Sequence, residues 1–195
     1  MSILLNQGIL SQPSGFRTTI ADMSITTQGT NGWYAGYFTT YGNGVSTNST
    51  TSSFSTTGMV YAPNPGASPG SWSGSLSGSA QFGTPFAGPG FFYPKSQSGT
   101  FSRNPAVVKW VSTRAGTALL TFAGYSTPTV YLKSIAIYVN NTKVAGYSPE
   151  TLSTASVSTT VTLAIGDAVY FEVNPASSTS YSDSFIPTNL SIQFQ

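Results

Sequence analysis

A strict alternation of apolar and polar residues near the C-terminus is the feature that most constrains how this chain can fold. The apolar positions Val157, Val161, Leu163 and Ile165 alternate with Ser158, Thr160, Thr162 and Ala164. Successive side chains of a strand point to opposite faces, so this period of two predicts a half-buried β-strand. Gly166-Asp167 predicts a turn, after which Val169, Phe171 and Val173 repeat the pattern in the next strand.

Similar patterns run from about residue 105 to the end of the chain. We expect strands over 107–111, 117–122, 130–139, 142–146, 157–165, 168–173 and 186–194. Asn140-Asn141 predicts the turn of a hairpin between the third and fourth of these. A series of short strands joined by tight turns is typical of an antiparallel sandwich. Residues 105–195 are therefore predicted to form an all-β, jelly-roll-like domain.

Residues 1–104 differ in composition and are predicted to form a loop-rich β region or an assembly arm. Strands are expected over 33–41 and 58–62, and residues 72–82 alternate Trp72, Gly74, Leu76, Gly78 and Ala80 with serines. Six prolines lie between residues 63 and 94, and proline removes a hydrogen-bond donor from a sheet. This segment is predicted to be ordered loop, whose aromatic side chains pack on the domain or on a neighbouring subunit.

Charged residues make up only 6% of the 195 residues, with a net charge of +2. The basic residues Arg103, Lys109 and Arg114 form the densest group, yet strand geometry places Arg114 on the opposite face from the other two. Nucleic-acid binding needs a clustered basic stripe, so no nucleic-acid partner is expected. No run of 18 apolar residues occurs, and no membrane partner is expected.

The chain contains neither cysteine nor histidine, which excludes Ser-His-Asp and Cys-His catalysis and makes zinc sites implausible. Asp167 is interpreted as a turn residue and Glu172 as an outward strand residue. Glu172 with Asp183 is the least unfavourable glycosidase pair, and Asp183 with Asp22 the least unfavourable calcium site. We predict no enzyme activity, no cofactor and no metal. The carboxylates are Asp22, Glu150, Asp167, Glu172 and Asp183.

Aromatic residues are abundant in this chain, at 13% of its residues. On a strand, Trp33, Tyr37 and Tyr41 share one face, which would form either a platform for a sugar or a core or interface surface. The candidate binding or interface aromatics are Trp33, Tyr37, Tyr41, Trp72, Phe91, Phe92 and Tyr93.

The strand–turn–strand segment VTLAIGDAVYFEV, residues 161–173, resembles the final strands of tumour-necrosis-factor and complement-type jelly rolls. The segment VYLKSIAIYVNNTKV, residues 130–144, resembles the preceding hairpin, and residues 184–192 the loop and last strand. The resemblance covers about residues 105–195 and implies a homotrimer that binds surfaces or receptors. Such domains also occur in bacteriophage particles as fibre heads, spikes and capsid decoration proteins.

Two functions follow as alternatives. The first is a structural virion protein, a trimeric capsid decoration (cement) or spike protein that binds itself and other virion proteins such as the major capsid protein. The second is a receptor-binding tip or carbohydrate-binding module that uses exposed aromatics against a host surface glycan. The segment 1–10 lacks the basic and small-residue features of a signal peptide, so the expected location is the virion.

Overall fold

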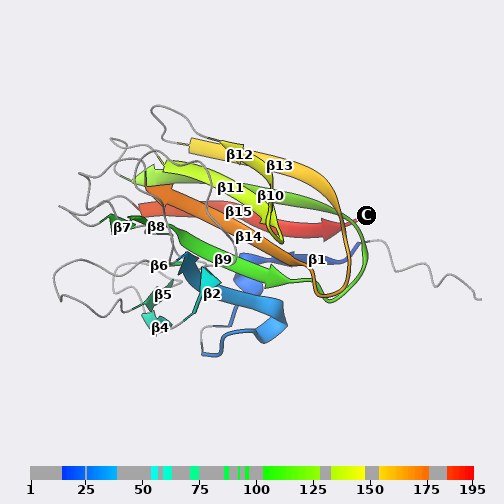
Figure 1. The fold of residues 1–195 in the computed structure, drawn as a ribbon, viewed down its shortest axis with the longest axis horizontal. Coiled ribbons are helices and arrows are strands. Elements are labelled where there is room, and N and C mark those ends of the chain that lie inside the picture. Colours follow the sequence, from blue (N-terminus) through cyan, green and yellow to red (C-terminus); the bar gives the residue numbers. More distant parts are fainter. Residues whose placement is uncertain are drawn as a thin grey trace, which may run out of the picture.

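A computed structural model shows two antiparallel β-sheets packed face to face (Figure 1). It describes residues 15–24, 26–38, 54–56, 59–62, 71–74, 86–87, 92, 95–96, 103–127, 133–147, 154–175 and 184–195. Apart from one hairpin within a sheet, successive strands of the second half alternate between the two sheets, as in a jelly roll. The predicted all-β class and jelly-roll-like sandwich are confirmed.

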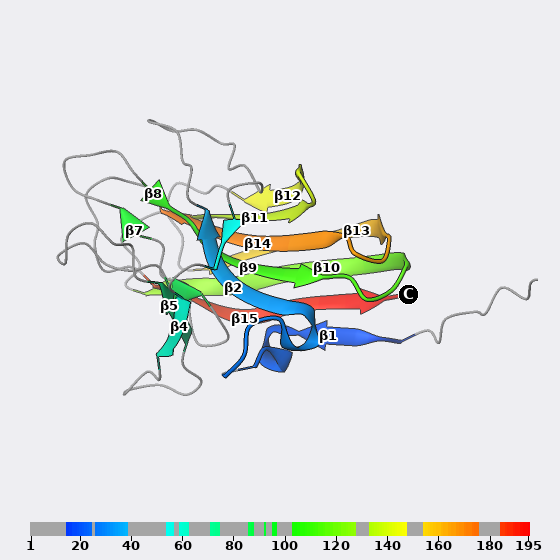
Figure 2. The ribbon, with the colours of Figure 1, turned by 60° about the horizontal axis from the view of Figure 1, so that its bottom comes forward.

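The first sheet contains four strands. In spatial order they are β1 (Arg17–Thr19), β15 (Ser184–Phe194), β10 (Gly116–Thr127) and β13 (Thr154–Leu163). β10 and β13 pair without a break from Gly116↔Leu163 to Tyr125↔Thr154. β10 and β15 pair with a register shift at Ala123/Gly124, which places a β-bulge in β15. Figure 2 shows β1 beside β15 at the border of the sheet.

The second sheet contains six strands. In spatial order they are β12 (Thr142–Tyr147), β11 (Lys133–Val139), β14 (Ala168–Pro175), β9 (Ala106–Val111), β2 (Trp33–Phe38) and β3 (Phe54–Ser55). The predicted hairpin is confirmed, since β11 and β12 pair across Asn140-Asn141. Asn140 has a φ of 51°, a left-handed conformation that asparagine tolerates better than most residues.

Short elements complete the described part of the chain. β4 (Met59–Ala62), β5 (Ser71–Gly74) and β6 (Phe86–Ala87) form a third sheet, and β7 (Lys95–Ser96) pairs with β8 (Arg103–Asn104). The 3-10 turns η1 (Ile20–Asp22) and η2 (Thr30–Gly32) lie between β1 and β2. Neither these turns nor any other helix within the described ranges is long and apolar enough to cross a membrane.

The prediction that residues 63–94 contain no sheet was wrong for β5 and β6. Both strands are short enough to lie between prolines instead of containing one: β5 between Pro69 and Pro85, and β6 between Pro85 and Pro89. The hydrogen-bonding restriction that proline imposes therefore applies to the flanking positions.

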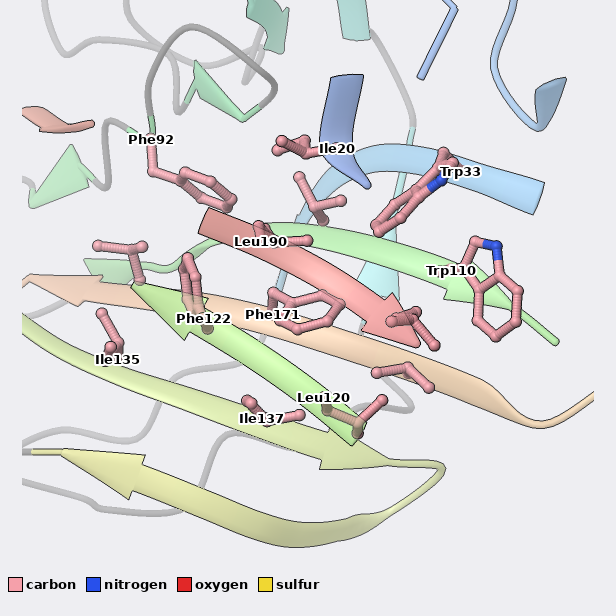
Figure 3. Packing of buried hydrophobic residues seen from close by; sticks show 14 of the residues in the cluster. Ile20, Trp33, Phe92, Trp110, Leu120, Phe122, Ile135, Ile137, Phe171 and Leu190 are labelled. Carbon is pink, nitrogen blue, oxygen red and sulfur yellow. The ribbon is translucent and has the colours of Figure 1, made fainter. Parts of the chain in front are cut away.

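The main core lies between the two large sheets (Figure 3). Leu120 and Phe122 of β10 face Ile135 and Ile137 of β11 across this space, and all four side chains are 0% exposed. The ring centroids of Phe122 and Phe171 are 5.6 Å apart in an edge-to-face arrangement that joins the sheets. The predicted alternation of β10, in which 118, 120 and 122 share a face, is confirmed.

The opposite face of the six-stranded sheet is also buried. A second cluster there contains Phe38, Val107, Ala136, Tyr138 and Tyr170, each no more than 8% exposed. Burial on both faces accounts for the nearly continuous apolar sequence AVVKWV of β9, which does not alternate.

The sandwich extends across the domain boundary predicted near residue 105. β1 pairs with β15, and β2 pairs with β9 from Trp33↔Trp110 to Tyr37↔Ala106. Strands from the first segment are therefore integral parts of both sheets. The composition change at residue 105 did not reveal this, because pairing between distant segments leaves no local pattern in the sequence.

A buried hydrogen bond joins β1 to the core. Its removal gives a prediction about stability. The indole Nε1 of Trp33 donates to Thr18 Oγ1 at 2.8 Å, and the two residues are 0% and 4% exposed. Thr18→Val keeps the shape but leaves the indole donor without its acceptor, which should cost ~1–3 kcal/mol of unfolding free energy. Denaturant unfolding measures this loss. Thr117→Val, at an exposed site, should change stability by less than about 0.5 kcal/mol, and equal effects would contradict the assignment.

Candidate functional site

The aromatic stripe predicted on the first long strand faces the core. Trp33 and Tyr37 are 0% and 4% exposed, and Trp33 stacks on Phe171 with ring centroids 6.2 Å apart (Figure 3). Phe92, also 0% exposed, packs its ring against Phe122 and Phe185. Of the two alternatives that the sequence left open for Trp33 and Tyr37, the structure therefore shows the core.

The side chains of the remaining predicted aromatics lie outside the described part of the structure. Trp72 lies in β5, where its backbone pairs with Tyr61, but its side chain lies outside the described part of the structure. Tyr41, Phe91 and Tyr93 lie outside the described residues altogether.

Two other tyrosines are exposed and line one shallow groove. Tyr125 near the end of β10 and Tyr147 at the end of β12 are 37% and 41% exposed. The groove has a volume of about 400 Å³ and is completed by Ala123, Gly124, Thr154, Ala155, Ser156 and Thr188. It lies where the edge strands of the two sheets, β12 and β13, approach each other.

Local geometry exposes Tyr125. Residues 118, 120 and 122 of β10 point inward, so Tyr125 has the opposite parity and points outward. Gly124 points inward, where the ring of Phe185 occupies the space that a side chain would need. The β15 bulge leaves Thr188 without a partner on β10 and brings it to the groove.

The described lining of this groove is electrically neutral. It combines two aromatic rings with the hydroxyl groups of Thr154, Ser156 and Thr188, and its described lining contains no charged side chain. Aromatic faces pack against apolar ring surfaces, while hydroxyls donate and accept hydrogen bonds. Such a lining suits a neutral ligand with both an apolar face and hydroxyl groups.

Sequence reasoning missed Tyr125 and Tyr147, although a signal for Tyr125 was present. The predicted inward series of 118, 120 and 122 already placed residue 125 on the solvent side. For Tyr147 no comparable signal exists, because its exposure depends on its position at the free end of an edge strand.

A second groove of about 560 Å³ lies beside β1 and the two 3-10 turns. Its lining includes Arg17, Asp22, Asn31 and Thr113. The Asp22 carboxylate already accepts hydrogen bonds from the Thr19 backbone N–H at 2.7 Å and from Thr18 Oγ1 at 3.1 Å. The groove is therefore built around a carboxylate that holds the local backbone together.

The described carboxylates serve the fold. The interpretation of Asp167 as a turn residue is confirmed: its oxygens accept from the Ala164 backbone N–H at 2.7 Å and from Asn140 Nδ2 at 3.0 Å. These bonds, led by the one from Asn140, hold the pKa of Asp167 below its usual value. The part of the chain that the structure describes contains no cluster of three potential metal-ligating residues.

Glu172 differs from its prediction as a solvent-facing strand residue. Its side chain points away from the main core, but it is only 2% exposed and accepts a hydrogen bond from the Tyr138 hydroxyl at 2.9 Å. The prediction failed because the second cluster covers this face of the sheet. Asp183, its proposed glycosidase partner and the partner of Asp22 in the proposed calcium site, lies outside the described residues.

Lys109 and Arg114 contact aromatic rings in different parts of the fold. Lys109 Nζ lies 4.9 Å from the centroid of Tyr34, and burial lowers the pKa of Lys109. The Arg114 guanidinium lies 3.6 Å from the centroid of Phe16. Burial of the Tyr170 hydroxyl raises its pKa. The side chain of Arg103 is not among those described.

The chain matches no protein-family model, and its sequence aligns significantly with no curated protein. Among solved structures it is similar to the CBM36-1 domain of a multidomain xylanase from the hindgut metagenome of Trinervitermes trinervoides, with 15% identity and a TM-score of 0.35 over 53% of this chain and 86% of that one. It is also similar to a carbohydrate-binding module CBM36 in complex with calcium and xylotriose, with 16% identity and a TM-score of 0.31 over 53% and 88%.

A third similar structure is the enzymatically active domain of tailspike protein 4 from bacteriophage CBA120. The identity is 13% and the TM-score 0.33, over 87% of this chain and 20% of that one. These neighbours are carbohydrate-binding modules and a phage tailspike. The resemblance to tumour-necrosis-factor and complement-type domains stays a prediction.

The lowered pKa of Asp167 predicts a pH-dependent contribution to stability. A carboxyl whose pKa is lower in the folded state stabilises the protein fully above its unfolded value, near 3.9, and loses this contribution as pH falls through the folded value. Asp167→Ala should therefore lower the melting temperature at pH 7 and leave it nearly unchanged at strongly acidic pH. Thermal unfolding over this pH range tests the effect. A gap that stays constant down to the lowest pH would contradict it.

Proposed function

We propose that this chain is a saccharide-binding module without catalytic activity. The observation that carries the proposal is the groove with two partly exposed tyrosines and three hydroxyl side chains, Thr154, Ser156 and Thr188. A sugar ring has an apolar face that packs on an aromatic ring and hydroxyls that pair with serine and threonine. The neutral lining favours an uncharged sugar, since its described residues offer no cation for a carboxylate or sulfate.

The positions of the described acids support binding without reaction, while Glu150 and Asp183 lie outside the described residues. Glycoside hydrolysis needs two carboxyl groups beside the scissile bond. The groove has none in its described lining, whereas Asp22 and Asp167 hold backbone turns and Glu172 is buried beside Tyr138. The histidine and cysteine that would support other hydrolytic mechanisms are absent from the sequence.

Removing the tyrosine rings tests this function. Tyr125→Ala and Tyr147→Ala should each weaken binding to the best ligand from a glycan array by about tenfold, or ~1.4 kcal/mol, because each removes part of the apolar contact. Isothermal titration calorimetry gives the affinities. Thr117→Ala, exposed on the same strand beyond the groove lining, is the matched control and should bind normally. Absence of any array ligand, or equal binding by all three variants, would refute the proposal.

A second candidate is a structural role in a bacteriophage particle as a capsid decoration or spike protein. Among the described strands, β13 has a long outer edge with no strand beside it, which favours this candidate because such an edge can join subunits. The virion location and the major capsid protein as partner belong to this candidate. So does the homotrimer, which would need a three-fold contact instead of a two-fold pairing of this edge.

The particle itself tests the second candidate. Quantitative mass spectrometry of purified virions should find the chain at a copy number that matches a symmetric set of capsid or tail positions. Its absence from washed particles would refute the virion role while leaving the saccharide-binding proposal intact.

A further inference from the structure

The two large sheets have four edge strands, and three of them carry features that prevent pairing with another strand. β1 is three residues long and contains Arg17, and β3 is two residues long. β12 contains Lys143 and a register shift in its pairing with β11. Short length, charge and bulges are the devices by which edge strands avoid association.

β13 has none of these features. It spans ten residues, TASVSTTVTL, without a charged residue or a proline, and its register with β10 is unbroken. Among the described residues, no backbone hydrogen bond reaches β13 from any strand other than β10. Within the described ranges its outer row of N–H and C=O groups therefore has no strand beside it, and β13 lies along the upper border of the sandwich in Figure 1.

Burial along β13 shows where the sandwich is incomplete. The inward-facing residues at its two ends, Ala155 and Leu163, are 8% and 1% exposed. The three inward-facing residues between them, Val157, Thr159 and Val161, are only half-buried. The least buried part of the inward-facing series is thus centred on Thr159, its middle residue.

The sequence of β13 is complementary to itself about this same residue. In an antiparallel pair with a two-fold axis at Thr159, Val157 lies opposite Val161 and Ala155 opposite Leu163 on the inner face. On the outer face, Ser158 lies opposite Thr160 and Ser156 opposite Thr162. Apolar pairs and Ser/Thr pairs are favourable cross-strand partners, and a two-fold contact needs a surface that matches itself.

We propose that β13 pairs edge to edge with β13 of a second copy of this chain, with the two-fold axis at Thr159. The pairing satisfies the open backbone groups and covers Val157 and Val161. It also carries Ile165, which is 73% exposed just beyond the end of β13, toward the Tyr147 end of the other copy's groove. The contact joins copies in pairs, so the assembly contains an even number of chains.

Like charges placed at the axis test the pairing. Thr159→Lys puts two ammonium groups opposite each other and should convert the assembly to monomers, as measured by size-exclusion chromatography with light scattering. Thr159→Glu should do the same, and mixing the two variants should restore the wild-type mass. Thr117→Lys adds the same charge to the interior strand β10 and should leave the mass unchanged.

Three outcomes would overturn the proposal. A wild-type mass of one or three chains at micromolar concentrations refutes the two-fold contact, and so does a Thr159→Lys variant that stays associated. Failure of the mixed Lys and Glu variants to associate, while circular dichroism shows both folded, refutes the register. Glycan binding is measured separately on the monomeric variant, so the result does not depend on the proposed function.

Discussion

The contact between the two sheets around Phe122 and Phe171 supports the rest of the structure. Phe122 comes from the four-stranded sheet and Phe171 from the six-stranded sheet, and their rings meet edge to face with centroids 5.6 Å apart. The indole of Trp33 stacks on the ring of Phe171. The rings of Phe92 and Phe185 pack against Phe122. Residues from widely separated parts of the chain thus meet at one point between the two large sheets.

This arrangement explains why so few charged residues suffice. The centre of the six-stranded sheet is buried on both faces, so Glu172 is enclosed beside Tyr138 and Lys109 is half-buried beside Tyr34. The four-stranded sheet presents its outer face to solvent through Ser and Thr side chains, such as Ser156, Ser158 and Thr160 of β13. Hydroxyl groups keep that face polar without charge, and the same chemistry lines the groove between Tyr125 and Tyr147.

The saccharide-binding and edge-pairing proposals meet at the N-terminal end of β13. Thr154 and Ser156 line the groove, and the same strand carries the uncovered edge. Association through this edge would place a groove at each end of the paired strands. A binding protein gains from such an arrangement, because two sites on one rigid body bind a surface with many copies of its ligand more tightly than either site alone.

By itself, the sequence determined the all-β class, most strands after residue 105, and the turns at Asn140 and Gly166, because alternation and turn chemistry are local properties. It also excluded histidine- and cysteine-dependent catalysis. Only the tertiary structure decided that Trp33 and Tyr37 lie in the core, that Glu172 is buried, and that β1 and β2 belong to the sandwich. A strand pattern predicts which face of a sheet a residue lies on. Whether that face is covered depends on segments far away in the chain. For the same reason the groove, which Tyr125 and Tyr147 form from two different sheets, became visible only in the folded molecule.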